Sequence, residues 1–110
     1  MMEMHLHDEP FKLVASGVKT IEARLYDGKR QTFKSGDVLK IYNRATGATI
    51  QALIVELMIA PNFSELIAGN EIADFGYNSV DDFLKILSPF YSDEDVRRFG
   101  VVGIRLRVID

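Results

Sequence analysis

The segment that decides the fold is Gly17–Arg30, which reads Gly-Val-Lys-Thr-Ile-Glu-Ala-Arg-Leu-Tyr-Asp-Gly-Lys-Arg. Its polar and apolar side chains alternate, which is typical of a strand because successive side chains point to opposite faces of a sheet. The face predicted to lie in the core consists of Ile21, Ala23 and Leu25, with Lys19 at its mouth. The opposite face consists of Thr20, Glu22, Arg24 and Tyr26.

This polar face has two interpretations. A polar row on an antiparallel strand is commonly the solvated face of the sheet. The alternative is a binding site, since hydroxyl, carboxylate, guanidinium and ammonium groups gather here, and opposite charges such as Glu22 and Arg24 can hold each other in place. Polar residues that line a cleft contribute little packing, so we expect Lys19→Ala and Glu22→Ala to leave the fold intact.

Length and composition limit the class of protein. A chain of 110 residues is expected to form one domain, residues 1–110, around a single core. Hydrophobic residues make up 47% and charged residues 26%, as in ordinary globular proteins, and no apolar run reaches the length that spans a bilayer. There is no cysteine and no secretory signal pattern. We therefore expect a cytoplasmic monomer without membrane association.

The charge distribution bears on the partner. A net charge of −3 argues against a protein that coats duplex nucleic acid, because such binding requires many phosphates to be neutralised. Residues 19–30 nevertheless hold four cations against two carboxylates, whereas carboxylates dominate residues 56–94. A compact cationic pocket on an acidic body favours a nucleotide or a short single strand.

The remaining sequence predicts a strongly bent sheet with short helices. Strands are expected over 4–7, 38–42, 48–59 and 101–109, and the long segment 48–59 is expected to bend and serve two parts of a barrel. Helices are predicted over 63–68, 80–87 and 93–99, with N-caps at Asn62, Ser79 and Ser92. Residues 70–78 have the composition of a loop.

Two further predictions concern the ends of the chain. Asp8 is expected to cap a first helix whose buried face holds Phe11, Val14 and Ala15. In the last strand, Arg105 and Arg107 are interpreted as solvated charges that protect a sheet edge.

The pair His5 and His7 is the one candidate for metal binding. Both side chains share a face if this segment is extended, but no third ligand or supporting carboxylate accompanies them. We therefore predict no metal site and no cofactor. The end of this first strand is instead expected to bring His7 near the polar strand.

Several linked elements resemble the ASCH domain family of the PUA-like superfamily. They are Leu6-His7, Pro10-Phe11, the run from Gly17 to Arg30, Gly36-Asp37, Gly76-Tyr77, Ser79-Val80, Phe83-Leu84, Tyr91-Ser92 and Phe99-Gly100-Val101-Val102. The resemblance extends over nearly the whole chain. It implies an α+β fold, a PUA-like small β-barrel with three to four short flanking helices.

The resemblance also implies a cleft beside the first helix that is associated with RNA binding or RNA metabolism. The residues expected to line it are Lys19, Thr20, Glu22 and Arg24, with Lys29 and Arg30 at its rim. Lysine and arginine can bind phosphate, Glu22 can accept from a base amino group, and Arg24 can orient Glu22 or contact a base acceptor. The expected partner is therefore RNA or a nucleotide or nucleoside ligand.

The alternative function is catalytic. One branch of the family is known as N4-acetylcytidine amidohydrolase, and Lys19 stands where that branch has its lysine, with Glu22 in place of its threonine. The branch's assisting glutamate has no counterpart in register, because this chain offers Asp74-Phe75-Gly76. If the protein is an enzyme, Lys19 and Glu22 are the expected catalytic residues. A ribonuclease is a third possibility within the wider family.

Overall fold

Two long antiparallel strands, β4 (Thr49–Ala60) and β5 (Val101–Val108), form the centre of the sheet. The computed structural model describes residues 2–110. The register between these strands shifts at Ile54 and Glu56. An irregularity of this kind bends a strand and increases its twist, so β4 can take part in two differently oriented parts of the sheet. This is the bent strand that the sequence predicts.

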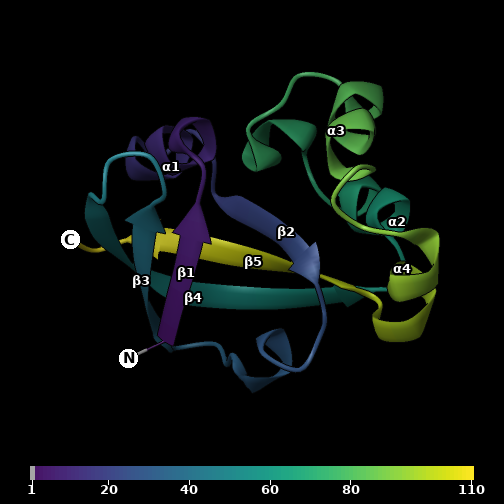
Figure 1. Cartoon of the computed structure of the whole chain (residues 1–110), viewed down its shortest axis with the longest axis horizontal. Helices are drawn as coiled ribbons and strands as arrows, with labels where there is room; N and C mark the ends of the chain where they lie inside the picture. The colour runs from purple at the N-terminus through teal and green to yellow at the C-terminus, as the bar shows by residue number, and fades with distance from the viewer. Residues whose placement is uncertain (1) are drawn as a thin grey trace.

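The other strands complete a mixed five-stranded sheet in the order β1-β3-β4-β5-β2 (Figure 1). β3 (Val38–Asn43) pairs with β4 and β2 (Ile21–Leu25) pairs with β5, both antiparallel, while β1 (Met2–Leu6) runs parallel to β3. The sheet curls into a half-barrel, so that the Arg24 side chain on one edge strand donates a hydrogen bond to the His5 carbonyl on the other, at 3.0 Å. The α+β, barrel-like fold is confirmed.

The helices gather at two ends of the sheet. α1 (Asp8–Ala15) covers one end, and α2 (Phe63–Ala68), α3 (Val80–Leu87) and α4 (Asp93–Phe99) cluster at the other (Figure 1). The three predicted N-caps are confirmed, because the side chains of Asn62, Ser79 and Ser92 each accept a hydrogen bond from the backbone three residues on. None of the helices in residues 2–110 has the length and apolar character needed to cross a membrane.

Two local predictions at α1 are wrong. Asp8 is the first residue of the helix, and the N-cap position belongs to His7, whose side chain makes no capping bond. The Asp8 carboxylate instead accepts from the Asn43 amide and pairs with Lys12 at 3.0 Å. Ala15 is exposed, because the helix presents only Phe11 and Val14 to the core.

The segment predicted as a loop, residues 70–78, contains a short 3-10 helix, η2 (Ile72–Phe75). A second such helix, η1 (Arg30–Thr32), follows β2. The fully buried Phe75 anchors η2 in the second of two hydrophobic clusters, the one beneath α2 and α3. Composition misses η2 because its anchor is a tertiary contact, and single-turn 3-10 helices have weak local signals.

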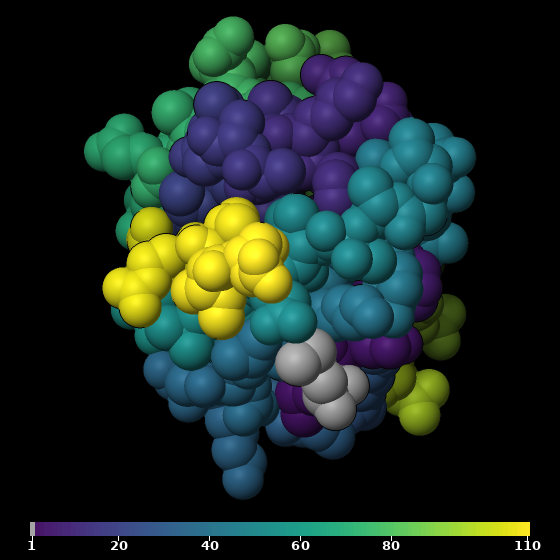
Figure 2. Space-filling view, turned by 90° about the vertical axis from the view of Figure 1, so that its left-hand side faces the viewer, coloured from purple at the N-terminus to yellow at the C-terminus, as the bar shows by residue number. Residues whose placement is uncertain are grey.

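The prediction of solvated edge charges in the last strand is wrong for Arg105, whereas Arg107 is exposed as predicted and lies beyond the residues of β5 that pair with β2. β5 lies between β4 and β2, so it is an interior strand. Arg105 pairs with Glu56 at 3.3 Å and with Asp74 at 3.6 Å, whereas Arg107 is exposed. The residues after β5 continue beside the start of β4, where Gln51 accepts from Ile109. Figure 2 shows this C-terminal end, in yellow, lying next to α1 on the surface of the molecule.

Candidate functional site

Three charged side chains from the Gly17–Arg30 segment form a buried cluster. Nζ of Lys19 lies 3.3 Å from Oε1 of Glu22, and Nε of Arg24 donates to Oε2 of Glu22 at 2.9 Å. Lys19 is 4% exposed and Glu22 is 7% exposed. Buried charges are rare unless they are paired, and here one carboxylate joins two cations. We call these three residues the inner cluster.

Strand alternation places Lys19 on the opposite face from Glu22 and Arg24, and that prediction is wrong. β2 begins only at Ile21, so Lys19 lies in the connection after α1, where strand alternation does not apply. The Lys19 ammonium donates to the Phe75 carbonyl at 2.9 Å, which holds it against η2. The turn of the chain before β2 therefore brings the ammonium to the side of the strand that carries Glu22.

A glycine at the end of η2 allows this short helix to lie close to Lys19. Gly76 has a φ of 88°, a backbone conformation that side chains disfavour. A Cβ at this position would lie 3.3 Å from the Lys19 Cβ and 3.2 Å from a Leu13 methyl group. The absence of a side chain at Gly76 therefore helps to position the Lys19 side chain.

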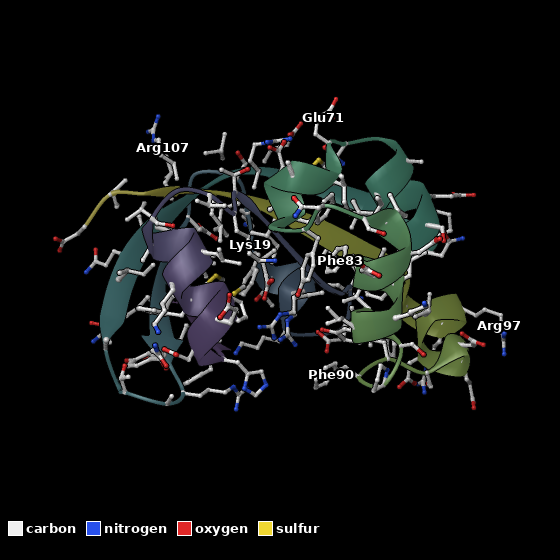
Figure 3. The ribbon with its side chains drawn as sticks, turned by 90° about the horizontal axis from the view of Figure 1, so that it is seen from above. Lys19, Glu71, Phe83, Phe90, Arg97 and Arg107 are labelled. Carbon is white, nitrogen blue, oxygen red and sulfur yellow. The ribbon has the colours of Figure 1, made fainter. Side chains whose placement is uncertain are left out.

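The inner cluster forms the floor of a cavity of about 220 Å³ between α1 and α3. The aromatic residues that line this cavity are Tyr77, Phe83, Phe90 and Tyr91. Figure 3 shows Lys19 beside Phe83, with Phe90 farther out on the same side of the molecule. The Lys19 ammonium lies 5.7 Å from the centre of the Phe83 ring. The cavity thus combines a charged floor with aromatic walls.

The electrostatics of the floor favour the charged forms. Burial raises the pKa of Glu22, but the charges of Lys19 and Arg24 and their hydrogen bonds outweigh burial, and the net result is a lowered pKa. Burial likewise lowers the pKa of Arg24, and the Glu22 charge more than reverses this. Burial raises the pKa of Tyr77 and of Tyr91. The site therefore holds a carboxylate acceptor, cationic donors and neutral phenols.

The sequence profile of the ASCH domain family matches residues 4–109 of the chain. The chain belongs to the ASCH domain family. No curated protein matches it. Among solved structures, the hypothetical protein PH0355 is 30% identical with a TM-score of 0.88 over 98% of each chain. Protein PF0455 from Pyrococcus furiosus is 27% identical with a TM-score of 0.80, over 99% of this chain and 97% of that one.

A more distant ASCH domain supports the fold alone. The ASCH domain from Lactobacillus crispatus is 15% identical with a TM-score of 0.66, over 97% of this chain and 78% of that one. The resemblance proposed from the linked sequence elements is therefore confirmed at the level of family and fold.

The other residues predicted for the cleft lie elsewhere in this ASCH domain. Thr20 lines a separate groove with the end of α1 and the end of β5, and its amide donates to the Asp74 carbonyl. Lys29 is exposed beside η1, and Arg30 pairs with Asp27 at 3.2 Å. None of these three residues lines the cavity above the inner cluster.

Several residues that line the cavity were not among those predicted for the cleft. His5, His7 and Arg44 line the cavity, as do Phe83 and Phe90. Phe83 carries a helical core signal, which does not indicate a ligand. Phe90 follows α3 and is 66% exposed, so no periodic pattern includes it. For His7, the sequence does give a signal. Its position at the end of the first strand predicts that it lies near the polar strand that carries Glu22 and Arg24.

Proposed function

We propose that this ASCH domain binds RNA, or a modified nucleoside, by taking one base into the cavity above Lys19, Glu22 and Arg24. The observation that carries the proposal is the hydrogen-bonding floor beneath aromatic walls. Sequence-specific RNA recognition commonly uses unstacked bases that stack on aromatic or arginine planes and hydrogen-bond through their edges. The cavity combines both kinds of group.

The floor matches the edge of a base. Glu22 is held as a carboxylate, so it can accept a hydrogen bond from an exocyclic amino group. The Arg24 guanidinium uses Nε for Glu22 and one terminal nitrogen for His5, which leaves further N–H groups to donate to a base acceptor. A base that offers an amino group beside an acceptor would therefore pair with both residues.

The size of the cavity favours a single base over a longer ligand. Sites for drug-sized molecules are commonly about 300–1,000 Å³, and this cavity is about 220 Å³. One base fits such a volume, while the sugar and neighbouring nucleotides remain outside. We therefore expect the contacts that read the ligand to be confined to one nucleotide unit.

Titration of the protein with short single-stranded RNA, followed by fluorescence anisotropy at several salt concentrations, tests this proposal. We expect a shallow salt dependence, since each contacted phosphate of a single strand contributes a slope of about −0.7. Glu22→Gln should lower affinity by about tenfold or more, because a hydrogen bond to a charged group is strong. Arg97→Gln, on the remote helix α4, is the control. Binding that is unaffected by Glu22→Gln would contradict the proposal.

Amide hydrolysis is the second candidate, and the contact between Lys19 and Glu22 favours it. With an ammonium and a carboxylate 3.3 Å apart, the Glu22 carboxylate would accept a proton from the attacking water and the Lys19 ammonium would donate one to the leaving amine. The Thr20 hydroxyl is not among the groups that line this cavity, so water would have to be the nucleophile. Incubation with N4-acetylcytidine, followed by chromatography, tests for release of cytidine. Intact RNA after prolonged incubation would argue against the ribonuclease alternative.

A further inference from the structure

The mouth of the cavity carries a second polar group, one arginine and two histidines, that differs from the floor. His5, His7 and Arg44 line the cavity from the end of β1 and from the loop after β3. We call these three residues the basic rim. Across the mouth, α3 and the residues after it contribute Ile86 and Phe90, which are 44% and 66% exposed. The mouth is therefore basic on one side and apolar on the other.

The end of β1 positions the whole basic rim. The His5 carbonyl accepts from Arg24, so the rim begins directly beside the floor. The Leu6 carbonyl accepts from the Arg44 amide at 2.8 Å, which fastens the Arg44 loop to the same strand. The His5 ring stacks on Tyr42 with 4.8 Å between ring centres. The rim is thus built on backbone that the sheet holds in place.

The charged groups of the floor are paired with one another, whereas the Arg44 charge of the rim has no salt-bridge partner within the described part of the chain. Glu22 pairs with both Lys19 and Arg24, which leaves the inner cluster with one net positive charge. Among residues 2–110, no salt bridge involves His5, His7 or Arg44. Of the acidic side chains near this strand, Asp8 pairs with Lys12 and Glu3 accepts from the Tyr42 hydroxyl, while the Glu9 charge acts on Tyr77 on the other side of the cavity. The rim is therefore the part of the site suited to an anion.

We infer that the ligand of this cavity is phosphorylated, with its base on the floor and a phosphate on its sugar held by His5, His7 and Arg44. This inference rests on the proposed function, because it takes the base to occupy the cavity. Guanidinium and imidazole N–H groups make charge-assisted hydrogen bonds to phosphate oxygens, and arginine presents a fork that matches them. The same chemistry is available from a free mononucleotide or from the backbone of an RNA strand.

The test compares nucleosides with their own phosphates. The four ribonucleosides, their 5′-monophosphates and RNA trinucleotides with the same central base are titrated by calorimetry against the full chain. The rim variant is the triple substitution His5→Gln, His7→Gln and Arg44→Gln, and Glu22→Gln alters the floor. The charge control replaces three exposed cations that do not line the cavity, in the triple substitution Lys34→Gln, Lys85→Gln and Arg97→Gln. Thermal unfolding checks that each variant is folded.

We expect at least one monophosphate to bind about tenfold or more tightly than its nucleoside, as one or more charge-assisted contacts would produce. The rim variant should remove this difference between the monophosphate and its nucleoside, whereas Glu22→Gln should weaken both ligands and the charge control neither. A trinucleotide that binds more tightly than the monophosphate, through the same rim, identifies RNA as the source of the phosphate. The reverse order identifies a free nucleotide.

Two results would overturn the inference, and they differ in meaning. If a nucleoside binds to the floor but its phosphates bind no better, or if the rim variant keeps the phosphate preference, the basic rim has no such role and the proposed function stands. If neither nucleosides, monophosphates nor trinucleotides bind to the unmodified chain, the proposed function fails together with this inference.

Discussion

Two charged clusters of this ASCH domain contain the same arginine–glutamate hydrogen bond, but one cluster is buried and the other is exposed. In the inner cluster, Nε of Arg24 donates to Glu22 at 2.9 Å, and in a second cluster Nε of Arg105 donates to Glu56 at 3.3 Å. We call the group formed by Arg105, Glu56, Asp74 and Asn70 the outer cluster. The Glu22 side chain is 9% exposed and the Glu56 side chain is 55% exposed.

The difference in burial gives the two clusters different roles. Water solvates the outer cluster and screens its charges, so its pairs stabilise the fold only slightly. In the inner cluster, protein groups take the place of water around the charges. Removing one charged side chain therefore leaves its partner buried without a counterion. The same desolvation strengthens any hydrogen bond that the inner cluster makes to a ligand in the cavity.

The largest expected effect comes from removing the shared carboxylate. Glu22→Ala leaves the buried Lys19 and the partly buried Arg24 without their counterion, so we expect the free energy of unfolding to fall by about 3–5 kcal/mol. The matched substitution Glu56→Ala should cost at most about 1 kcal/mol, because that pair is exposed. Urea denaturation monitored by circular dichroism measures both. This revises the prediction that Glu22→Ala leaves the fold intact, and equal losses for the two variants would remove the distinction between the clusters.

Acid should reproduce part of this loss reversibly. The pKa of Glu22 is lowered in the folded state, so its contribution to stability is present above its ordinary pKa of 4.5 and disappears as the pH falls through the folded-state value. The difference in unfolding free energy between the unmodified chain and Glu22→Gln should therefore shrink below pH 4.5. Urea denaturation at a series of pH values measures it. Because the pKa of Asp8 is also lowered, both proteins are compared in an Asp8→Asn background.

A smaller effect, on binding alone, is expected at the aromatic wall. Phe90 is exposed, so Phe90→Ala should leave stability nearly unchanged while weakening RNA binding by about 1–3 kcal/mol, the value of one base stacked on an aromatic ring. Ile59→Ala, at another exposed apolar position outside the cavity, is the control. Anisotropy titration measures the change. Equal affinities for the two variants would show that Phe90 does not contact the ligand.

The smallest effect is expected at Lys29, a cation of the same sequence segment that lies in neither cluster. Lys29→Gln should change the free energy of unfolding by less than about 0.5 kcal/mol, because the side chain is exposed. Its effect on RNA binding should likewise be slight, since it lies outside the cavity. A loss of affinity as large as that of Glu22→Gln would show that Lys29 contributes to binding, as the sequence predicts.

Local rules account for what could be predicted from the sequence. Helix caps such as Asn62 and Ser79 depend on residues three positions apart, and the bent strand 49–60 is predicted from a long segment rich in isoleucine, leucine and valine. These features need only neighbouring residues, so they survive in any fold that contains them. The linked elements from Leu6 to Val102 indicated the family for the same reason, since each is a short pattern. The expectation of a polar group containing Glu22 and Arg24 followed from strand alternation alone.

The tertiary structure decided which of these polar residues meet. Lys19 is held beside Glu22 by its hydrogen bond to the carbonyl of Phe75, which lies 56 positions along the chain. Arg105 lies on an interior strand because β2 pairs with the outer side of β5. The basic rim unites β1 with a loop that follows β3, and Phe90 reaches the cavity from beyond α3. Sequence determined the local elements and the presence of the charges. Only the folded chain brought distant groups together, because burial and pairing depend on neighbours in space that no short pattern contains.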